Sequence, residues 1–275
     1  MKISKKILAV GSCAALLCGC LALTACGGGN ADNGAQKPAA NDTPKAADYK
    51  LLTEGTITVA TSADYPPMEY MDGDEIKGFD PALMQEIGDR LGLKIELKNQ
   101  AFDSLVTAVA GGSSCDVAIS AITIDDERAE QVDFSESYYD SNLAIVVMAD
   151  SKFEKKGEMN SDEVAVGAQS GSSGEAWAKE NLKKAGYTPY QETPDLLQAL
   201  RTGKIDCAVY DDPVAQAHVA GEYKDMRILD VIPTGEQYGI IVNKDNAALT
   251  EAINGALKEI KDDGTYAKLV KKYLA

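Results

Sequence analysis

The side chains that could do catalytic chemistry are few in this sequence. Its 275 residues include one histidine, His218, and no serine or cysteine nucleophile pattern lies near it. A triad of nucleophile, histidine and carboxylate therefore has one candidate base and no matching nucleophile. The sequence also lacks the cysteine and histidine spacings that are typical of metal sites. We expect no catalytic residues, no metal and no cofactor.

The residues that could bind a charged small molecule are better placed. Arg128 follows a buried, strand-like run that ends at Ser120. Arginine binds carboxylates well because its guanidinium donates two parallel hydrogen bonds. The turn at 171–174 (GSSG) precedes a predicted helix and could add hydroxyl and backbone N–H donors. Asp211, just past the strand-like run 207–210, could pair with an ammonium group.

Alternating strands and helices must position these groups. In the first half we predict strands at 56–60, 93–97 and 116–120, a turn at 64–67, and helices from about 79 to 91 and from 102 to 110. In the second half we predict strands at 164–167 and 207–210 and helices at 175–185 and 195–201. This order is typical of βαβ units with a largely parallel sheet. Segments 105–119 and 196–209 resemble each other, which indicates two similar α/β lobes with a ligand cleft between them.

Composition and charge exclude some functions. The chain is 45% hydrophobic and 25% charged, an ordinary globular composition. Its formal net charge of −16 argues against binding nucleic acid or an anionic membrane surface. Cys115 and Cys207 are the cysteines outside the N-terminal region. We interpret both as buried thiols, and a disulfide between them is the alternative.

The N-terminus has the layout of a secretory signal. Lys2, Lys5 and Lys6 precede an apolar run at 7–23, which leads into Leu-Thr-Ala before Cys26. The sequence Leu-Thr-Ala-Cys resembles a bacterial lipobox, whose cysteine is acylated and becomes the new N-terminus. Alternatives are a cleaved signal without lipid and an uncleaved membrane helix, for which the run is short.

The next segment, 27–47, has no apolar periodicity and is rich in Gly, Asn, Ala and Pro, so we interpret it as a flexible tether. Cys20 is a weaker lipidation candidate than Cys26. We expect an extracytoplasmic protein that is anchored to the cell membrane by an N-terminal lipid.

The folded part also resembles a known family. From 55 to 274 the chain is similar to the solute-binding proteins of polar amino acid ABC transporters, bacterial extracellular solute-binding protein family 3, which includes histidine- and glutamine-binding proteins. The resemblance rests on the order and spacing of these stretches: VATSADYPPMEY, GFDPALMQEI, AFDSLVTAV, CDVAISAITIDDER, VDFSESYYDS, AVGAQSGSSGE, GKIDCAVYDD and DDGTYAKLVKKY.

The resemblance implies a fold and a function. The fold would be the type II periplasmic-binding-protein fold, with two α/β lobes joined by two crossing hinge strands. The implied boundaries are 1–25 for the signal peptide, 26–47 for the lipidated cysteine and tether, 48–138 plus 239–275 for lobe 1, and 143–234 for lobe 2. The crossings would fall near 138–142 and 232–238. The protein would act as a monomer that captures a free amino acid and delivers it to a permease.

Matching positions imply the ligand-binding residues. Arg128 matches the arginine that binds the ligand's carboxylate, and Asp211 matches the aspartate that holds its ammonium. The other implied contacts are Ser120, Ala121 and Thr123 (backbone and hydroxyl groups), Ser172 and Ser173 (carboxylate contacts of lobe 2), Tyr65 and Phe102 (an aromatic sandwich), and Gln169 (the side-chain pocket).

Departures from the family leave the ligand's side chain open. Family members that bind basic ligands, and the glutamine binder, are similar to one another in having an acidic residue at one position, where this chain has Ser62. Asp64 lies two positions later, and we expect it to point away. Met68 replaces an aromatic residue. We favour a polar, uncharged amino acid, with a basic one second.

Each assignment has a plainer alternative. Arg128 could be a surface residue, Tyr65 and Phe102 could be core aromatics, and Asp211 could cap a helix. At the level of function, the alternatives are a dehydratase-like lyase on the same fold and a ligand-sensing lipoprotein.

Overall fold

The structure is a computed structural model that describes residues 49–275. The expected signal peptide (1–25), the lipidated Cys26 and the tether lie outside the described residues. Within the described part, no helix has the length and apolar character that crossing a membrane requires.

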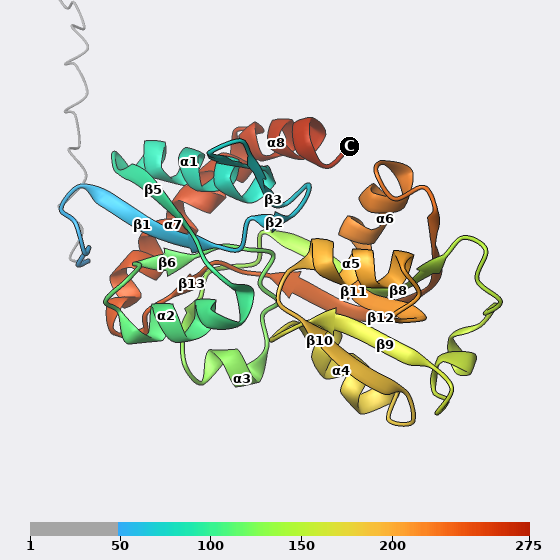
Figure 1. Cartoon of the computed structure of the whole chain (residues 1–275). Coiled ribbons are helices and arrows are strands. Elements are labelled where there is room, and N and C mark those ends of the chain that lie inside the picture. The colour runs from blue at the N-terminus through green and yellow to red at the C-terminus, as the bar shows by residue number, and fades with distance from the viewer. Residues whose placement is uncertain (1–48) are drawn as a thin grey trace, which may run out of the picture. The chain divides into compact units, whose positions relative to one another are not determined.

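Residues 49–275 contain two five-stranded sheets, and the first has the strand order β5-β1-β6-β13-β7 (Figure 1). Its strands are β1 (Thr56–Thr61), β5 (Lys94–Asn99), β6 (Val117–Ala118), β7 (Asp133–Phe134) and β13 (Ile241–Val242). β1 pairs in parallel with β5 and β6, and β13 pairs antiparallel to β6 and β7. The carboxyl ends of β1 and β6 therefore meet at the same edge of the sheet.

Helices cover both faces of this sheet. They are α1 (Phe79–Leu91), α2 (Leu105–Gly111), α7 (Ala247–Asp262) and α8 (Thr265–Tyr273), with the short helices η1 (Phe102–Ser104), α3 (Asp126–Ala129) and η3 (Lys244–Asn246) in the connections. α1, α7 and α8 pack against one another over one face, and α2 packs over the other. Leu83, Met84 and Ile87 of α1 are buried at helical spacing, and Gly92 ends that helix in the left-handed conformation.

The second sheet has the strand order β10-β9-β11-β8-β12. Its strands are β8 (Tyr139–Met148), β9 (Ala165–Gln169), β10 (Gly186–Tyr190), β11 (Cys207–Asp211) and β12 (Met226–Tyr238), and its helices are η2 (Lys156–Met159), α4 (Ser173–Asn181), α5 (Thr193–Arg201) and α6 (Asp212–Ala220). α4 lies on one face of this sheet, and α5 and α6 lie on the other (Figure 1). β9, β10 and β11 are parallel, so β9 and β11 also end at a common edge.

A small antiparallel sheet adds further side chains to the first lobe. It consists of β2 (Asp64–Tyr65), β3 (Glu69–Asp72) and β4 (Glu75–Lys77). Tyr65 pairs with Glu69 across β2 and β3, so two residues that are four apart in sequence lie side by side.

Two long strands connect the lobes. β8 and β12 pair antiparallel from Tyr139 opposite Tyr238 to Met148 opposite Met226. Because they leave the region of the first sheet and run into the second, they are the crossing strands of a two-lobed α/β fold (Figure 1). We call the part around the first and small sheets lobe 1 and the part around the second sheet lobe 2.

Some predicted elements were wrong in extent. The helix predicted at 175–185 is α4, which ends at Asn181, and the strand predicted at 116–120 is reduced to β6. Residues 64–67 were predicted as a turn, but Asp64 and Tyr65 form β2. Cys115 and Cys207 are buried and free, as the interpretation of both as thiols predicted.

Candidate functional site

All ten sequence-predicted ligand contacts line one cavity between the two lobes. They are Tyr65, Phe102, Ser120, Ala121, Thr123, Arg128, Gln169, Ser172, Ser173 and Asp211. Five residues that the sequence did not single out as contacts complete the lining: Asp64, Glu69, Gly174, Thr193 and Tyr210. The free volume is only about 20 Å³, room for roughly one water molecule, so the lobes are closed on each other.

Arg128 lies at one end of the cavity. Asp125, the N-cap of α3, accepts a hydrogen bond from the Arg128 backbone N–H, and its carboxylate lies 3.2 Å from Arg128 Nε. The guanidinium also donates to the carbonyls of Thr123 (2.6 Å) and Gly171 (2.9 Å). Arg128 is 8% exposed, so it is no surface residue, and the Gly171 bond joins the lobes.

The beginning of α4 faces the same end of the cavity. Ser172 is its N-cap, and the Ser172 hydroxyl accepts from the backbone N–H of Glu175 at 3.1 Å. Ser172 Oγ also donates to the carbonyl of Gln169 at 2.8 Å, which fixes the turn. The first N–H groups of a helix have no partner within the helix, so this end of the cavity offers donors to an anion.

Asp211, the last residue of β11, lines the cavity from lobe 2. It occupies the N-cap position of α6, but its side chain makes no capping bond. The carboxylate instead accepts from Tyr65 Oη at 2.5 Å and from Ser141 Oγ at 3.4 Å. Burial raises the pKa of Asp211 to about 7. An ammonium group beside it would favour the charged carboxylate.

Aromatic rings line the walls. Phe102 lies under Arg128, with Arg128 Cζ 5.7 Å from the ring centroid. Tyr65 packs edge-on against Tyr210, with centroids 6.4 Å apart.

Asp64 was expected to point away, and this prediction was wrong. Its carboxylate lines the cavity and accepts from Ser62 Oγ (2.9 Å), from Gln169 Nε2 (3.0 Å) and from the backbone N–H of Thr193 (2.8 Å). Two of these donors belong to lobe 2. Asp64 therefore brings a carboxylate to the cavity two positions after Ser62, and this carboxylate joins the lobes.

Glu69 brings a third carboxyl to the cavity from β3. It is 1% exposed, and its Oε1 accepts from Ser120 Oγ at 2.8 Å. Burial, followed by the charge of Asp80, raises the pKa of Glu69 well above its ordinary range. The spacing of residues in the sequence does not predict Glu69 as a lining residue, because its position depends on the pairing of β2 with β3.

Three buried oxygens of the lining have no hydrogen-bond partner among residues 49–275. They are Glu69 Oε2, Thr193 Oγ1 and Tyr210 Oη. All three can accept hydrogen bonds. Buried polar atoms normally have partners, so this wall could accept bonds from a ligand rich in donors.

Ala121 holds a strained turn beside these groups. Its φ of 47° is in the left-handed region, where residues other than glycine are uncommon. The Ala121 N–H donates to Asp80 Oδ2 at 2.8 Å, and this bond holds the turn after β6 in place.

Glu236 on β12 lies at the rim and was also missed. Its Oε2 accepts from Thr123 Oγ1 of lobe 1 at 3.0 Å and from Ser173 Oγ of lobe 2 at 2.9 Å. One carboxylate oxygen on a crossing strand thus joins hydroxyls of both lobes. Because each hydroxyl has one proton, neither of these two can also donate to a ligand in this arrangement.

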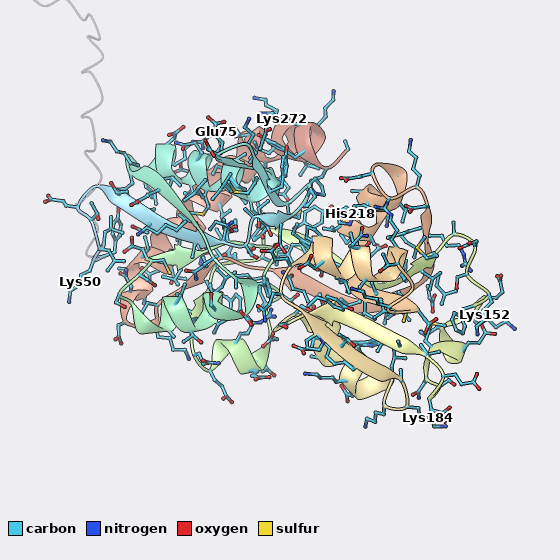
Figure 2. The ribbon with its side chains drawn as sticks, viewed as in Figure 1. Lys50, Glu75, Lys152, Lys184, His218 and Lys272 are labelled. Carbon is cyan, nitrogen blue, oxygen red and sulfur yellow. The ribbon has the colours of Figure 1, made fainter. Side chains whose placement is uncertain are left out.

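His218, the one histidine of the sequence, is not among the residues that line the cavity. His218 lies in α6 and is labelled in Figure 2; it is buried against Tyr210 and Tyr223. Burial lowers the pKa of His218 to about 4, so it is neutral at pH 7. In the part of the chain that the structure describes, no cluster of His, Cys, Asp and Glu could hold a metal ion.

The family model of the bacterial extracellular solute-binding proteins, family 3, matches residues 57–275. The chain belongs to this family. Among its relatives, this family 3 protein is 34% identical to the arginine-binding extracellular protein ArtP of Bacillus subtilis (93% of this chain, 94% of ArtP). It is 31% identical to a probable histidine-binding protein of Neisseria gonorrhoeae (95% and 94%).

Solved structures agree with the fold. An ancestral arginine-binding protein bound to arginine superposes with a TM-score of 0.75 and 35% identity, covering 80% of this chain and 99% of that one. The family 3 protein therefore has the two-lobed type II fold that the sequence predicted.

Proposed function

We propose that this protein captures a free amino acid with a cationic side chain between its lobes and delivers it to the permease of an ABC importer. The observation that supports this most is the pairing of opposite charges in one cavity, with Arg128 at one end and Asp211 across from it. A free amino acid is a zwitterion and needs both.

Arg128 and Asp211 would bind the α-carboxylate and the α-ammonium of the ligand. Its carboxylate would take the guanidinium N–H groups of Arg128 that now donate to the Thr123 and Gly171 carbonyls, together with N–H groups at the start of α4. Its ammonium would replace the Tyr65 hydroxyl as the donor to Asp211. Arg128 and Asp211 each have protein partners in this structure, and the ligand would replace some of these bonds.

The side-chain end supports a basic ligand. Asp64 and Glu69 line the cavity, and the unpartnered oxygens of Glu69, Thr193 and Tyr210 are all acceptors. A guanidinium has five donors and no acceptor, so arginine matches this wall best. A polar, uncharged side chain, which the sequence favoured, remains the alternative.

Ligand binding would be communicated to the permease by closure of the two lobes. In the closed form, bonds at Tyr65–Asp211, Arg128–Gly171 and Asp64–Thr193 join the lobes. With so little free volume, a ligand must enter through an opened form and then replace some of these bonds. It favours closure only by its differential affinity for the closed form, which the permease would recognise.

Anchoring and organisation complete the proposal. A signal peptide at 1–25 would direct export and be removed, and a lipid on Cys26 would anchor the monomer to the membrane, with the rest of 26–47 as the tether between the lipid and the lobes. Lobe 1 would comprise 48–138 plus 239–275, and lobe 2 would comprise 143–234.

An enzyme of the lyase class is a second candidate, and one observation favours it. Burial gives Asp211 a pKa of about 7, which suits a general acid or base. Incubating the protein with its bound amino acid and analysing the ligand by mass spectrometry separates the two. Recovery of unchanged ligand supports the binder, and conversion supports the enzyme.

A thermal-shift screen tests the proposed function. The full chain is stripped of ligand by unfolding and refolding, then mixed with each of the twenty amino acids, ornithine, citrulline and cystine. A ligand at 100 times its dissociation constant adds about 2.7 kcal/mol of stability. We expect arginine to give the largest shift, with lysine or ornithine next. A largest shift with glutamine or cystine would overturn the cationic assignment, and no shift would overturn the binder.

A further inference from the structure

Two buried carboxyl groups lie together behind the side-chain end of the cavity. Glu69 is 1% exposed and Asp80 is 0% exposed, and two consecutive residues hold them: Glu69 Oε1 accepts from Ser120 Oγ at 2.8 Å, and Asp80 accepts from the backbone of Ala121. Asp80 Oδ2 accepts from the Ala121 N–H and from Tyr138 Oη, both at 2.8 Å. Glu69 Oε2 and Asp80 Oδ1 have no donor among the described side chains and backbone.

One proton shared by the pair explains this arrangement. Two adjacent carboxylates cannot both be charged without a cation, and carboxylate oxygens donate only when protonated. No Lys or Arg within residues 49–275 forms an ion pair with either group. Burial raises the pKa of Asp80 to about 6, in the same direction as that of Glu69.

The other titratable groups around the pair do not neutralise it. Asp64 on β2 adds negative charge, and Tyr138, which precedes β8, is held neutral by burial, which raises its pKa. Within the cavity, Arg128 and Asp211 belong to the zwitterion-binding end. A cationic ligand side chain would therefore be the first positive charge to face the pair directly.

We propose that Glu69 and Asp80 form a proton-linked specificity site: a cationic ligand side chain displaces their shared proton to solvent, and a neutral one leaves it in place. Asp80 is a positioning residue here, because it acts on the ligand through Glu69. This inference rests on the proposed function and adds a property that plain charge attraction does not predict. Arginine affinity should rise with pH until the pair has lost its proton, because release of one proton makes binding about tenfold tighter per pH unit.

Comparing arginine with citrulline distinguishes proton release at Glu69 and Asp80 from proton release elsewhere in the cavity. They have the same shape and the same α-carboxylate and α-ammonium, so any proton that Asp211 releases is common to both. Isothermal titration of the full chain at pH 6 in phosphate and in bis-tris, two buffers with different ionisation enthalpies, gives the number of protons released by each ligand, from the dependence of the observed enthalpy on the buffer. We expect arginine to release roughly one proton more than citrulline.

A variant pair localises the effect. Asp80→Asn removes the charge that helps raise the pKa of Glu69, so the pH at which arginine affinity levels off should move down. Asp89→Asn removes a carboxylate from an exposed position of the same helix and should leave that pH unchanged. If Asp80→Asn does not fold, the proton counts of the unaltered protein decide alone.

The outcomes are distinct. Equal proton release by arginine and citrulline, with both bound, overturns this inference and leaves the proposed function standing. Failure of arginine to bind at all overturns the proposed function and this inference with it.

Discussion

The hydroxyl of Tyr65 lies 2.5 Å from Asp211 Oδ2 and 3.0 Å from the Asp211 backbone nitrogen. The first residue belongs to lobe 1 and the second to lobe 2, so this double contact joins the lobes at the place where an ammonium would bind. In the proposed binding mode, ligand binding and lobe closure would therefore use the same carboxylate.

Removing the titrating group at Asp211 should change how stability depends on pH. Burial raises its pKa to about 7 from an ordinary 3.8, so the folded protein favours the protonated form. The stabilisation is fully present below about pH 4 and is lost as the pH rises through 7. Without ligand, the free energy of unfolding should fall between pH 4 and 8 in the unaltered protein. In Asp211→Asn we expect this fall to be smaller by roughly 1 to 4 kcal/mol. Urea unfolding of both proteins, with Asp140→Asn as an exposed control, measures this, and parallel curves would contradict it.

Replacing Arg128 with alanine should weaken ligand binding by about 2 to 5 kcal/mol, because the ligand's carboxylate would be buried without its partner. Arg90→Ala is the control, since Arg90 pairs with Asp263 on the surface of lobe 1. Calorimetric titration with arginine checks both variants. Near-normal affinity in Arg128→Ala would show that the carboxylate binds elsewhere.

Gly171 offers a test of closure that leaves every binding side chain in place. A Cβ there would lie 3.1 Å from the backbone Cα of Asp103 in lobe 1, and its φ is +75°. Gly203 has a similar φ of +70° with no atom within 4 Å of such a Cβ. Both alanine variants should lose about 1 to 2 kcal/mol of stability through backbone strain, but only Gly171→Ala should also lose affinity. Equal affinities in the two variants would argue that closure does not limit binding.

Glu236→Gln should speed ligand release by roughly tenfold, because hydrogen bonds to a charged group are worth about 1.5 to 3 kcal/mol and two of them weaken here. Asp140→Asn removes a carboxylate from the opposite crossing strand, where its partner is Gln237, and serves as control. Stopped-flow dissociation measures the rates. An unchanged rate in Glu236→Gln would mean that this bridge does not hold the closed form.

The fold and the zwitterion-binding end could be predicted because they follow from local order. Asp211 ends β11, Ser172 directly precedes α4 and Arg128 lies in the short helix α3, and parallel strands bring their ends to one edge. Helix α1 was visible from apolar residues at helical spacing.

The side-chain end could not be predicted in the same way. Glu69 reaches the cavity because β2 pairs with β3, and Asp64 does so through bonds to Ser62 and to lobe 2. Glu236 sits at the rim only because β12 crosses between the lobes. These placements depend on tertiary contacts, which strand and helix periodicity does not encode.

The most direct test of the central claim is a crystal structure of the protein with saturating L-arginine. We expect one arginine in the cavity, with its carboxylate on Arg128, its ammonium on Asp211 and its guanidinium within hydrogen-bond distance of Glu69. Arginine bound elsewhere, or in the cavity with its guanidinium away from Glu69, would contradict the account.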